Sequence, residues 1–224
     1  MSQQLVVSEA FPAPGVGPAG LAWDGKTLWH ADYRAGQIFG LDSQNGSIRK
    51  KLYCPGNLSG LAWDGRSLWQ SLFDQEMIRC INPDTNDFDE TVILSGQGWL
   101  SGVAWDGRKL WVVAQQYGRL LSIDLTTNET YPPVNALVAI GDIDYRDDYL
   151  WASVASPMEF DNRLGRFNWL SASPEYAIVQ IDPHDGRVHA QYPADSLYSG
   201  LCWVGESLYM SHAVSRMILT ARLQ

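Results

Sequence analysis

The sequence predicts an all-β fold, a five-bladed β-propeller with four antiparallel strands per blade, because one hairpin motif recurs at a nearly fixed interval. The most complete copy, GLAWDGRSLW, spans residues 60–69, and close copies span residues 20–29 and 102–111. Weaker copies, GDIDYRDDYLW and GLCWVGESLY, begin at Gly141 and Gly200. The copies begin about 40 residues apart, with the last one delayed by roughly 20 more, and a period of about 40–45 residues is typical of propeller blades.

Each copy of the motif has the pattern of two strands joined by a tight turn. Leu61 and Trp63 alternate with a small residue, as in a half-buried strand, and Asp64-Gly65 is a strong hairpin signal. We expect Gly60 to lie where the blades crowd the central axis and leave no room for a side chain. The two tryptophans of each copy, such as Trp63, are predicted to be fully enclosed between neighbouring sheets.

The elements can be assigned in chain order. One strand at residues 5–11 precedes the first motif, and the final unit is one strand short, so we expect the N-terminal strand to close the last blade. The five units begin near residues 20, 60, 102, 141 and 200 and form a single domain over residues 1–224. The fourth unit carries an insertion at residues 155–176, which is too short for a further blade.

Composition limits the functions that are open to the chain. The net charge of −9 argues against binding to nucleic acid or to an anionic membrane. No signal peptide or transmembrane segment is visible, and the three cysteines fit free thiols, so we expect a cytoplasmic location. The histidines and cysteines have no metal-ligand spacing, which disfavours a metal site. The sequence indicates no particular cofactor and leaves the oligomeric state open.

The repeat resembles that of known propeller families. The unit G-L-x-W/Y-D-G-x-x-L-W, followed by I-x-x-I-D-P-x-x-G, is similar to the glutamine cyclotransferase (plant-type glutaminyl cyclase) family, the streptogramin lyases and the NHL repeats. The five units match the first of these best. In that family an acidic residue near the start of the second strand is implicated in catalysis. The matching positions here hold no acidic residue; they are His30, Gln70, Val112, Ala152 and Met210.

Candidate functional residues gather on one face of the predicted ring. The Asp-Gly hairpins and the turns between third and fourth strands share one end, and the loops that break the repeat share the other end. His212 occupies the repeat position of Asp32 in the adjacent blade, so the two can act as base and orienting group, with Glu76 as an alternative carboxylate. A surface or hydrogen-bonded structural role is the simpler alternative for His212.

Two tryptophans outside the repeat, Trp99 and Trp169, are candidates for the walls of a ligand pocket on that face. The alternative is that Trp169 only anchors the insertion and Trp99 only plugs the ring. The further candidate binding residues are Arg34, Tyr117, Arg163, Asp74 and Phe73. These features favour an enzyme that acts on a small molecule, of lyase, cyclase or cyclotransferase type. The absence of a strong catalytic motif leaves a non-catalytic ligand-binding or protein-interaction propeller as the alternative.

Overall fold

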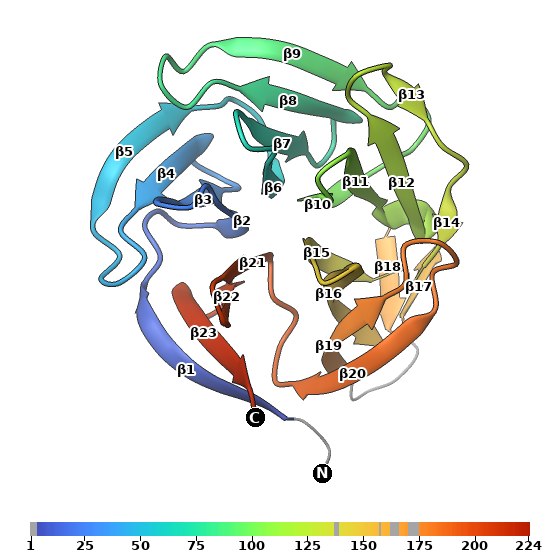
Figure 1. The fold of residues 1–224 in the computed structure, drawn as a ribbon. Coiled ribbons are helices and arrows are strands. Elements are labelled where there is room, and N and C mark those ends of the chain that lie inside the picture. The colour runs from blue at the N-terminus through green and yellow to red at the C-terminus, as the bar shows by residue number, and fades with distance from the viewer. Residues whose placement is uncertain (1–3, 137–138, 157, 162–165, 170–174) are drawn as a thin grey trace.

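The computed structural model describes residues 4–136, 139–156, 158–161, 166–169 and 175–224. Five antiparallel sheets are arranged as blades around a central axis, which confirms the predicted five-bladed β-propeller (Figure 1). In blades one to four the strands run from the axis outwards in sequence order, whereas in blade five the N-terminal strand takes the outermost position. Apolar side chains of adjacent blades form the core between them. Among the described residues no helix is long and apolar enough to cross a membrane.

The strands of the first three blades follow the predicted pattern. Blade one consists of β2 (Pro18–Trp23), β3 (Leu28–Asp32), β4 (Gln37–Leu41) and β5 (Ile48–Tyr53). Blade two consists of β6 (Leu58–Trp63), β7 (Leu68–Leu72), β8 (Met77–Ile81) and β9 (Phe88–Ile93). Blade three consists of β10 (Leu100–Trp105), β11 (Lys109–Ala114), the short helix η1 (Gln115–Tyr117), β12 (Arg119–Asp124), β13 (Glu129–Thr130) and β14 (Val134–Asn135). Two short strands, β13 and β14, share the outer position of blade three.

The last two blades contain the irregular parts of the chain. Blade four consists of β15 (Ile140–Arg146), β16 (Tyr149–Ser156), β19 (Glu175–Ile181) and β20 (Val188–Ala194). Between β16 and β19, the strands β17 (Met158–Asp161) and β18 (Arg166–Trp169) pair only with each other. Blade five consists of β21 (Gly200–Val204), β22 (Ser207–His212), β23 (Met217–Leu223) and β1 (Leu5–Pro12). In the view along the axis, β17 and β18 lie towards the outside of the ring (Figure 1).

The N-terminal strand closes the ring as predicted. β1 pairs antiparallel with β23, from Leu5 opposite Leu223 to Pro12 opposite Met217. Beyond these strands, the backbone amides and carbonyls of Gln4 and Gln224 bond to each other in both directions, at 2.9 and 3.0 Å. The outer edge of β23 is therefore covered, and the two ends of the described chain lie side by side (Figure 1).

Glycine at the axis allows the inner strands to approach closely. A β-carbon on Gly60 would lie 2.4 Å from the backbone nitrogen of Val103 in the next blade, and one on Gly20 would lie 2.5 Å from that of Leu61. Real β-carbons do not tolerate such contacts, so the predicted role of Gly60 is confirmed.

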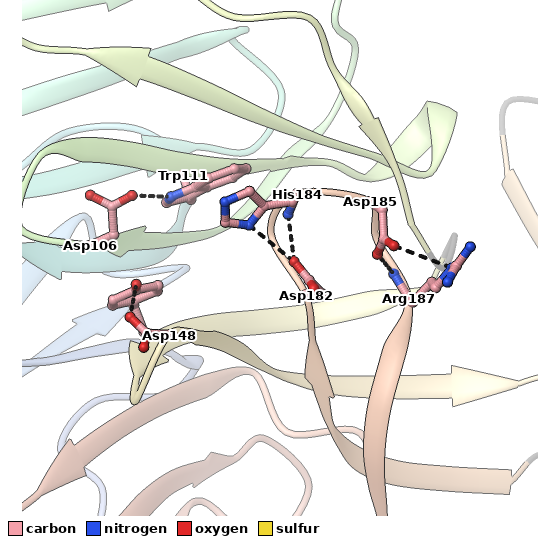
Figure 2. A network of polar contacts seen from close by, with 8 residues as sticks. Asp106, Trp111, Asp148, Asp182, His184, Asp185 and Arg187 are labelled. Atoms are coloured by element: carbon pink, nitrogen blue, oxygen red, sulfur yellow. Dashed lines mark hydrogen bonds and ion pairs between the residues drawn. The ribbon is translucent and has the colours of Figure 1, made fainter.

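The hairpin aspartate joins the turn to the second strand. In blade two, Asp64 Oδ1 accepts the N–H groups of Arg66 and Ser67, and Oδ2 accepts the indole N–H of Trp69, each at 2.7 Å. Blades one and three repeat this arrangement, and Figure 2 shows the bond between Asp106 and Trp111. Gly65 has a φ of 98°, as the predicted tight turn requires.

The two tryptophans of each motif differ in environment, and the expectation that Trp63 is fully enclosed is wrong. The second one, such as Trp69, is buried between blades, with 2% of its surface exposed. Trp63 is half-buried and lines a cavity at one end of the axis. Both positions are apolar and alternate in the same way, so sequence periodicity does not separate a tryptophan between sheets from one at the channel end.

Blade four departs from the predicted alignment by one residue. Ile143 pairs with Ala152 as Leu61 pairs with Gln70, so Asp142 rather than Gly141 occupies the position of the axial glycine Gly60. The hairpin here places two residues at positive φ, Asp147 and Asp148, and lacks the Asp-Gly sequence. The fourth inner strand therefore brings a carboxylate to the axis, where the other four blades have glycine.

Deleting residues 1–12 tests the closure of the ring. The deletion removes β1 and leaves the edge of β23 unpaired, so we expect a lower melting temperature and association between copies. Differential scanning calorimetry and light scattering measure both effects. Deleting residues 1–3 is the matched control, since it removes no residue of β1 and should change neither quantity. A monomeric deletion variant that melts at the wild-type temperature would contradict the stabilising role of β1.

Candidate functional site

A pocket of about 550 Å³ opens at one end of the central axis, on the face that carries the second-to-third-strand loops. Its floor is formed where the inner strands begin, by Ala19, Ser59, Gly141 and Ser199. Its walls come from loops of blades one, two and five, including Tyr33, Phe73 and Val214. The volume and the largely apolar walls match those of small-molecule sites. We refer to this cavity as the loop-face pocket.

Two arginines provide positive charge in the loop-face pocket. Arg34 follows β3 and Arg216 precedes β23, and both side chains are exposed. The lining contains no aspartate or glutamate, and among the described residues neither arginine forms an ion pair. In a chain with a net charge of −9, this local positive charge favours an anionic ligand.

An aromatic row leads from the loop-face pocket towards blade three. The ring of Phe73 lies 6.2 Å from that of Tyr33, edge to face, and 5.2 Å from that of Trp99, stacked. Tyr33 and Phe73 line the pocket, and Trp99 packs behind Phe73. The structure therefore brings Phe73 and Arg34 together in one cavity and places Trp99 one ring away from it.

Asp32 organises the loops beneath Arg34. Its carboxylate accepts four backbone N–H groups: Val16 and Gly17 at 2.6 and 3.1 Å on Oδ2, and Arg34 and Ala35 at 2.8 and 2.7 Å on Oδ1. Burial opposes ionisation, but these N–H groups together lower the pKa of Asp32 below its usual value. Asp32 thus holds a fixed negative charge and positions the backbone of Arg34, while the Arg34 side chain remains available.

His212 occupies the position of Asp32 in blade five, as the repeat predicted. Its Nδ1 lies 2.6 Å from Ser215 Oγ, and its ring packs edge-on against Tyr198, with 5.9 Å between ring centres. The next two residues, Ala213 and Val214, line the loop-face pocket. His212 and Asp32 therefore have separate hydrogen-bond partners, and the pocket is lined by the residues that follow His212 rather than by His212 itself.

The other candidate polar residues that the structure describes do not line the pocket and have partners of their own. Glu76 accepts the backbone N–H groups of Gly98 and Gly96 at 2.7 and 2.9 Å, which fixes the loop that carries Trp99. Asp74 accepts the side-chain amide of Asn57 at 2.7 Å. Tyr117, at the end of η1, lies under the guanidinium of Arg119. Arg163 and the side chain of Trp169 lie outside the described residues.

Sequence reasoning missed Arg216, Tyr33 and Val214 as pocket residues. Arg216 has a φ of 56° in the turn that leads into β23, a position that the repeat marks only as a loop. A sequence signal for Tyr33 was available, because Tyr33 and Phe73 occupy the same repeat position, directly after the second strand of their blades.

A buried carboxyl group, that of Asp142, lies at the axis. Asp142 Oδ2 accepts the N–H of Leu201 at 2.9 Å, while Oδ1 has no hydrogen-bond partner among the described residues. Burial raises the pKa of Asp142 well above its usual range, against the backbone amides of Leu201, Ile143 and Val103. Asp144 lies two residues on, and burial raises the pKa of its carboxyl to about 6.

The residues matching the acidic second-strand position of the glutamine cyclotransferase family are all buried. Burial lowers the pKa of His30 to about 4, which outweighs the opposing effect of the Asp32 charge and keeps the imidazole neutral at pH 7. Gln70 donates to the carbonyl of Gly60 at 2.9 Å, a contact that braces the inner strand. These side chains belong to the interior of the blades.

The fold and the axial cavity define a five-bladed β-propeller with a pocket at one channel mouth. No protein-family profile and no curated protein sequence matches the chain. Among solved structures, it is similar to the glutaminyl cyclase of Myxococcus xanthus, with a TM-score of 0.77 and 14% identity over 99% of this chain and 97% of that one. A streptogramin B lyase structure is similar with a TM-score of 0.57 and 14% identity, over 98% of both chains. At this identity the likeness establishes the fold alone.

Replacing Asp142 with asparagine tests the buried carboxyl. Because the pKa of Asp142 is raised, the folded state binds the carboxyl proton more tightly than the unfolded chain does. The ionisable carboxyl therefore lowers the stability of the folded state as the pH rises above the usual carboxyl range towards the folded pKa. We expect Asp142→Asn to gain stability over the wild type as the pH rises from about 4 to 7, measured as the urea midpoint. Asp87→Asn, at an exposed site, is the control. A stability difference that does not change with pH would contradict the assignment.

Proposed function

We propose that the loop-face pocket binds a small organic anion that carries an apolar or aromatic part. The observation that supports this best is that one cavity contains both Arg34 and Arg216 beside an aromatic wall of Tyr33 and Phe73. Among the described residues neither arginine forms an ion pair. Guanidinium groups recognise carboxylate and phosphate oxygens by paired hydrogen bonds. The apolar wall buries the apolar part of the ligand, which adds a favourable free energy of binding to that of the polar contacts.

The arginines test the anion-binding proposal. Arg34→Gln and Arg216→Gln should each weaken the binding of an aromatic carboxylate, found by thermal-shift screening, about tenfold to a hundredfold, the effect of losing a charged hydrogen bond. Asp32 holds the Arg34 turn through its backbone, so the Arg34 variant should fold normally. Arg66→Gln, in an exposed hairpin at the other end, is the matched control. If neither pocket variant changes the dissociation constant measured by calorimetry, the anion site lies elsewhere.

A reaction on this ligand, of lyase, cyclase or cyclotransferase type, is the second part of the proposal. Its support is the place of His212 directly before Ala213 and Val214 of the pocket wall, where His212 is hydrogen-bonded to Ser215, together with the likeness in fold to a glutaminyl cyclase and a streptogramin lyase. Histidine is the side chain most often used to move a proton in catalysis. The matching second-strand positions hold no carboxylate, so His212 is the proton carrier that we assign, with Asp32 as a fixed charge nearby.

His212→Asn tests this assignment. Mass spectrometry of incubations with the ligands found by screening, together with glutaminyl peptides, detects turnover. We expect the variant to lose about 10²–10⁴ in kcat while it keeps the dissociation constant of the ligand, since general acid–base groups contribute in that range. His184→Asn, in a turn at the opposite end, is the control. Ligand binding without turnover by the wild type would instead support the non-catalytic function.

A further inference from the structure

The end of the axis opposite the loop-face pocket is ringed by aromatic side chains. Each inner strand carries an aromatic residue at the same position in the register. This residue pairs with a leucine of the second strand of its blade, as Trp63 pairs with Leu68. All are half-buried and all line one cavity of about 230 Å³; they are Trp23, Trp63, Trp105, Tyr145 and Trp203. We call this cavity the tryptophan vestibule.

Packing between the blades accounts for only part of each ring at these positions. Each ring packs partly against the interblade core and partly lines the cavity. In blades one to three the hairpin aspartate accepts the indole N–H of the other tryptophan of the motif, as in the bond from Trp69 to Asp64. In the vestibule, Trp203 Nε1 is buried and has no hydrogen-bond partner among the described residues. Aliphatic side chains would fill the same space without leaving a buried donor unpaired.

The vestibule also contains a carboxylate. Asp144 lines the cavity, and its Oδ2 and Oδ1 accept the backbone N–H groups of Trp203 and Tyr145 at 2.7 and 2.9 Å. The titratable and charged groups packed around it are Asp142 and Arg146 on its own strand and Cys202 on β21. The inner strands of blades one to three contribute only apolar residues to the lining.

The surroundings of the vestibule favour positive charge. Acidic side chains outnumber basic ones in the turns at this end, and each hairpin around the mouth carries at least one carboxylate: Asp24, Asp64, Asp106, Asp148 and Glu206. One aromatic ring of the vestibule already has a cation on it. The guanidinium carbon of Arg146, a residue that also lines the cavity, lies 4.4 Å from the centre of the Trp203 ring, and the group donates to Gly205 O and Glu206 Oε1.

We propose that the tryptophan vestibule binds a small quaternary ammonium ion, such as the head group of choline. Aromatic rings around a cavity attract such cations through their electron-rich faces. A methylated ammonium needs no hydrogen-bond acceptor, which suits a cavity whose one carboxylate already accepts two backbone N–H groups. This site is separate from the loop-face pocket and does not depend on the function proposed for it.

The first test compares choline with 3,3-dimethylbutan-1-ol, in which an uncharged carbon replaces the nitrogen of choline. Binding of each compound is measured by calorimetric titration of the full chain. We expect choline to bind at least about tenfold more tightly, because the isostere has the same shape but no charge for the aromatic rings and Asp144 to attract. Equal binding of the two compounds, or no binding of choline to the folded wild type at about pH 7.5, would overturn the proposal.

Variants then locate the site. Trp63→Leu should weaken choline binding about threefold to thirtyfold, and Trp63→Phe by less, since one aromatic contact is removed or reduced. Trp105→Phe gives a second measurement if the leucine variant fails to fold. Arg34→Gln, at the other end of the axis, should leave choline binding unchanged. Loss of choline binding in Arg34→Gln, or wild-type affinity in all three tryptophan variants, would contradict this location.

The pH dependence supplies an independent test. Burial holds the pKa of Asp144 at about 6, so its negative charge develops as the pH rises through that value. Choline affinity should therefore increase between about pH 5 and 7 in the wild type, and this increase should be absent in Asp144→Asn. The same pH profile in both proteins would overturn the role of Asp144 in the site.

Discussion

The close contact of five inner strands at the axis is the constraint on which the rest of the structure depends. A β-carbon would not fit at Gly20, Gly60 or Gly102, so these glycines set the distance between blades. At that distance, aromatic and aliphatic side chains of neighbouring sheets fill the interblade space. The axis is narrow at its middle and widens at both ends, where the two cavities lie.

Asp142 is the exception at the axis, and it has consequences for both ends. Its carboxyl replaces a glycine hydrogen, accepts an N–H from blade five and interacts with Val103 of blade three. Burial favours the protonated form, so the middle of the axis has less negative charge than its sequence suggests. The loop-face pocket is lined by arginines, whereas each hairpin at the other end of the axis carries at least one carboxylate.

Much of the fold could be predicted from the sequence, because the Asp-Gly hairpin is a local signal that needs no tertiary information. The spare N-terminal strand likewise predicted closure with β23. The one-residue shift of blade four was missed because GDIDYRDDYLW aligns by its glycine, whereas strand pairing is decided by the burial of Ile143 and the positive φ values of Asp147 and Asp148. The candidate site was predicted in part: Arg34 and Phe73 line the pocket, but Arg216 comes from a turn whose conformation the repeat does not encode.

The pairing of β1 with β23 also affects how the chain folds during synthesis. β23 follows the other four blades in the sequence, so β1 has no sheet to join until β23 has left the ribosome. Contacts between residues so far apart in sequence form slowly, and an unpaired strand edge can associate with other chains in the meantime. In β1, charged Glu9 and polar Ser8 interrupt the apolar run, which makes such premature pairing less favourable. The blades can therefore form in order along the chain, while the ring closes only once β23 is available to pair with β1.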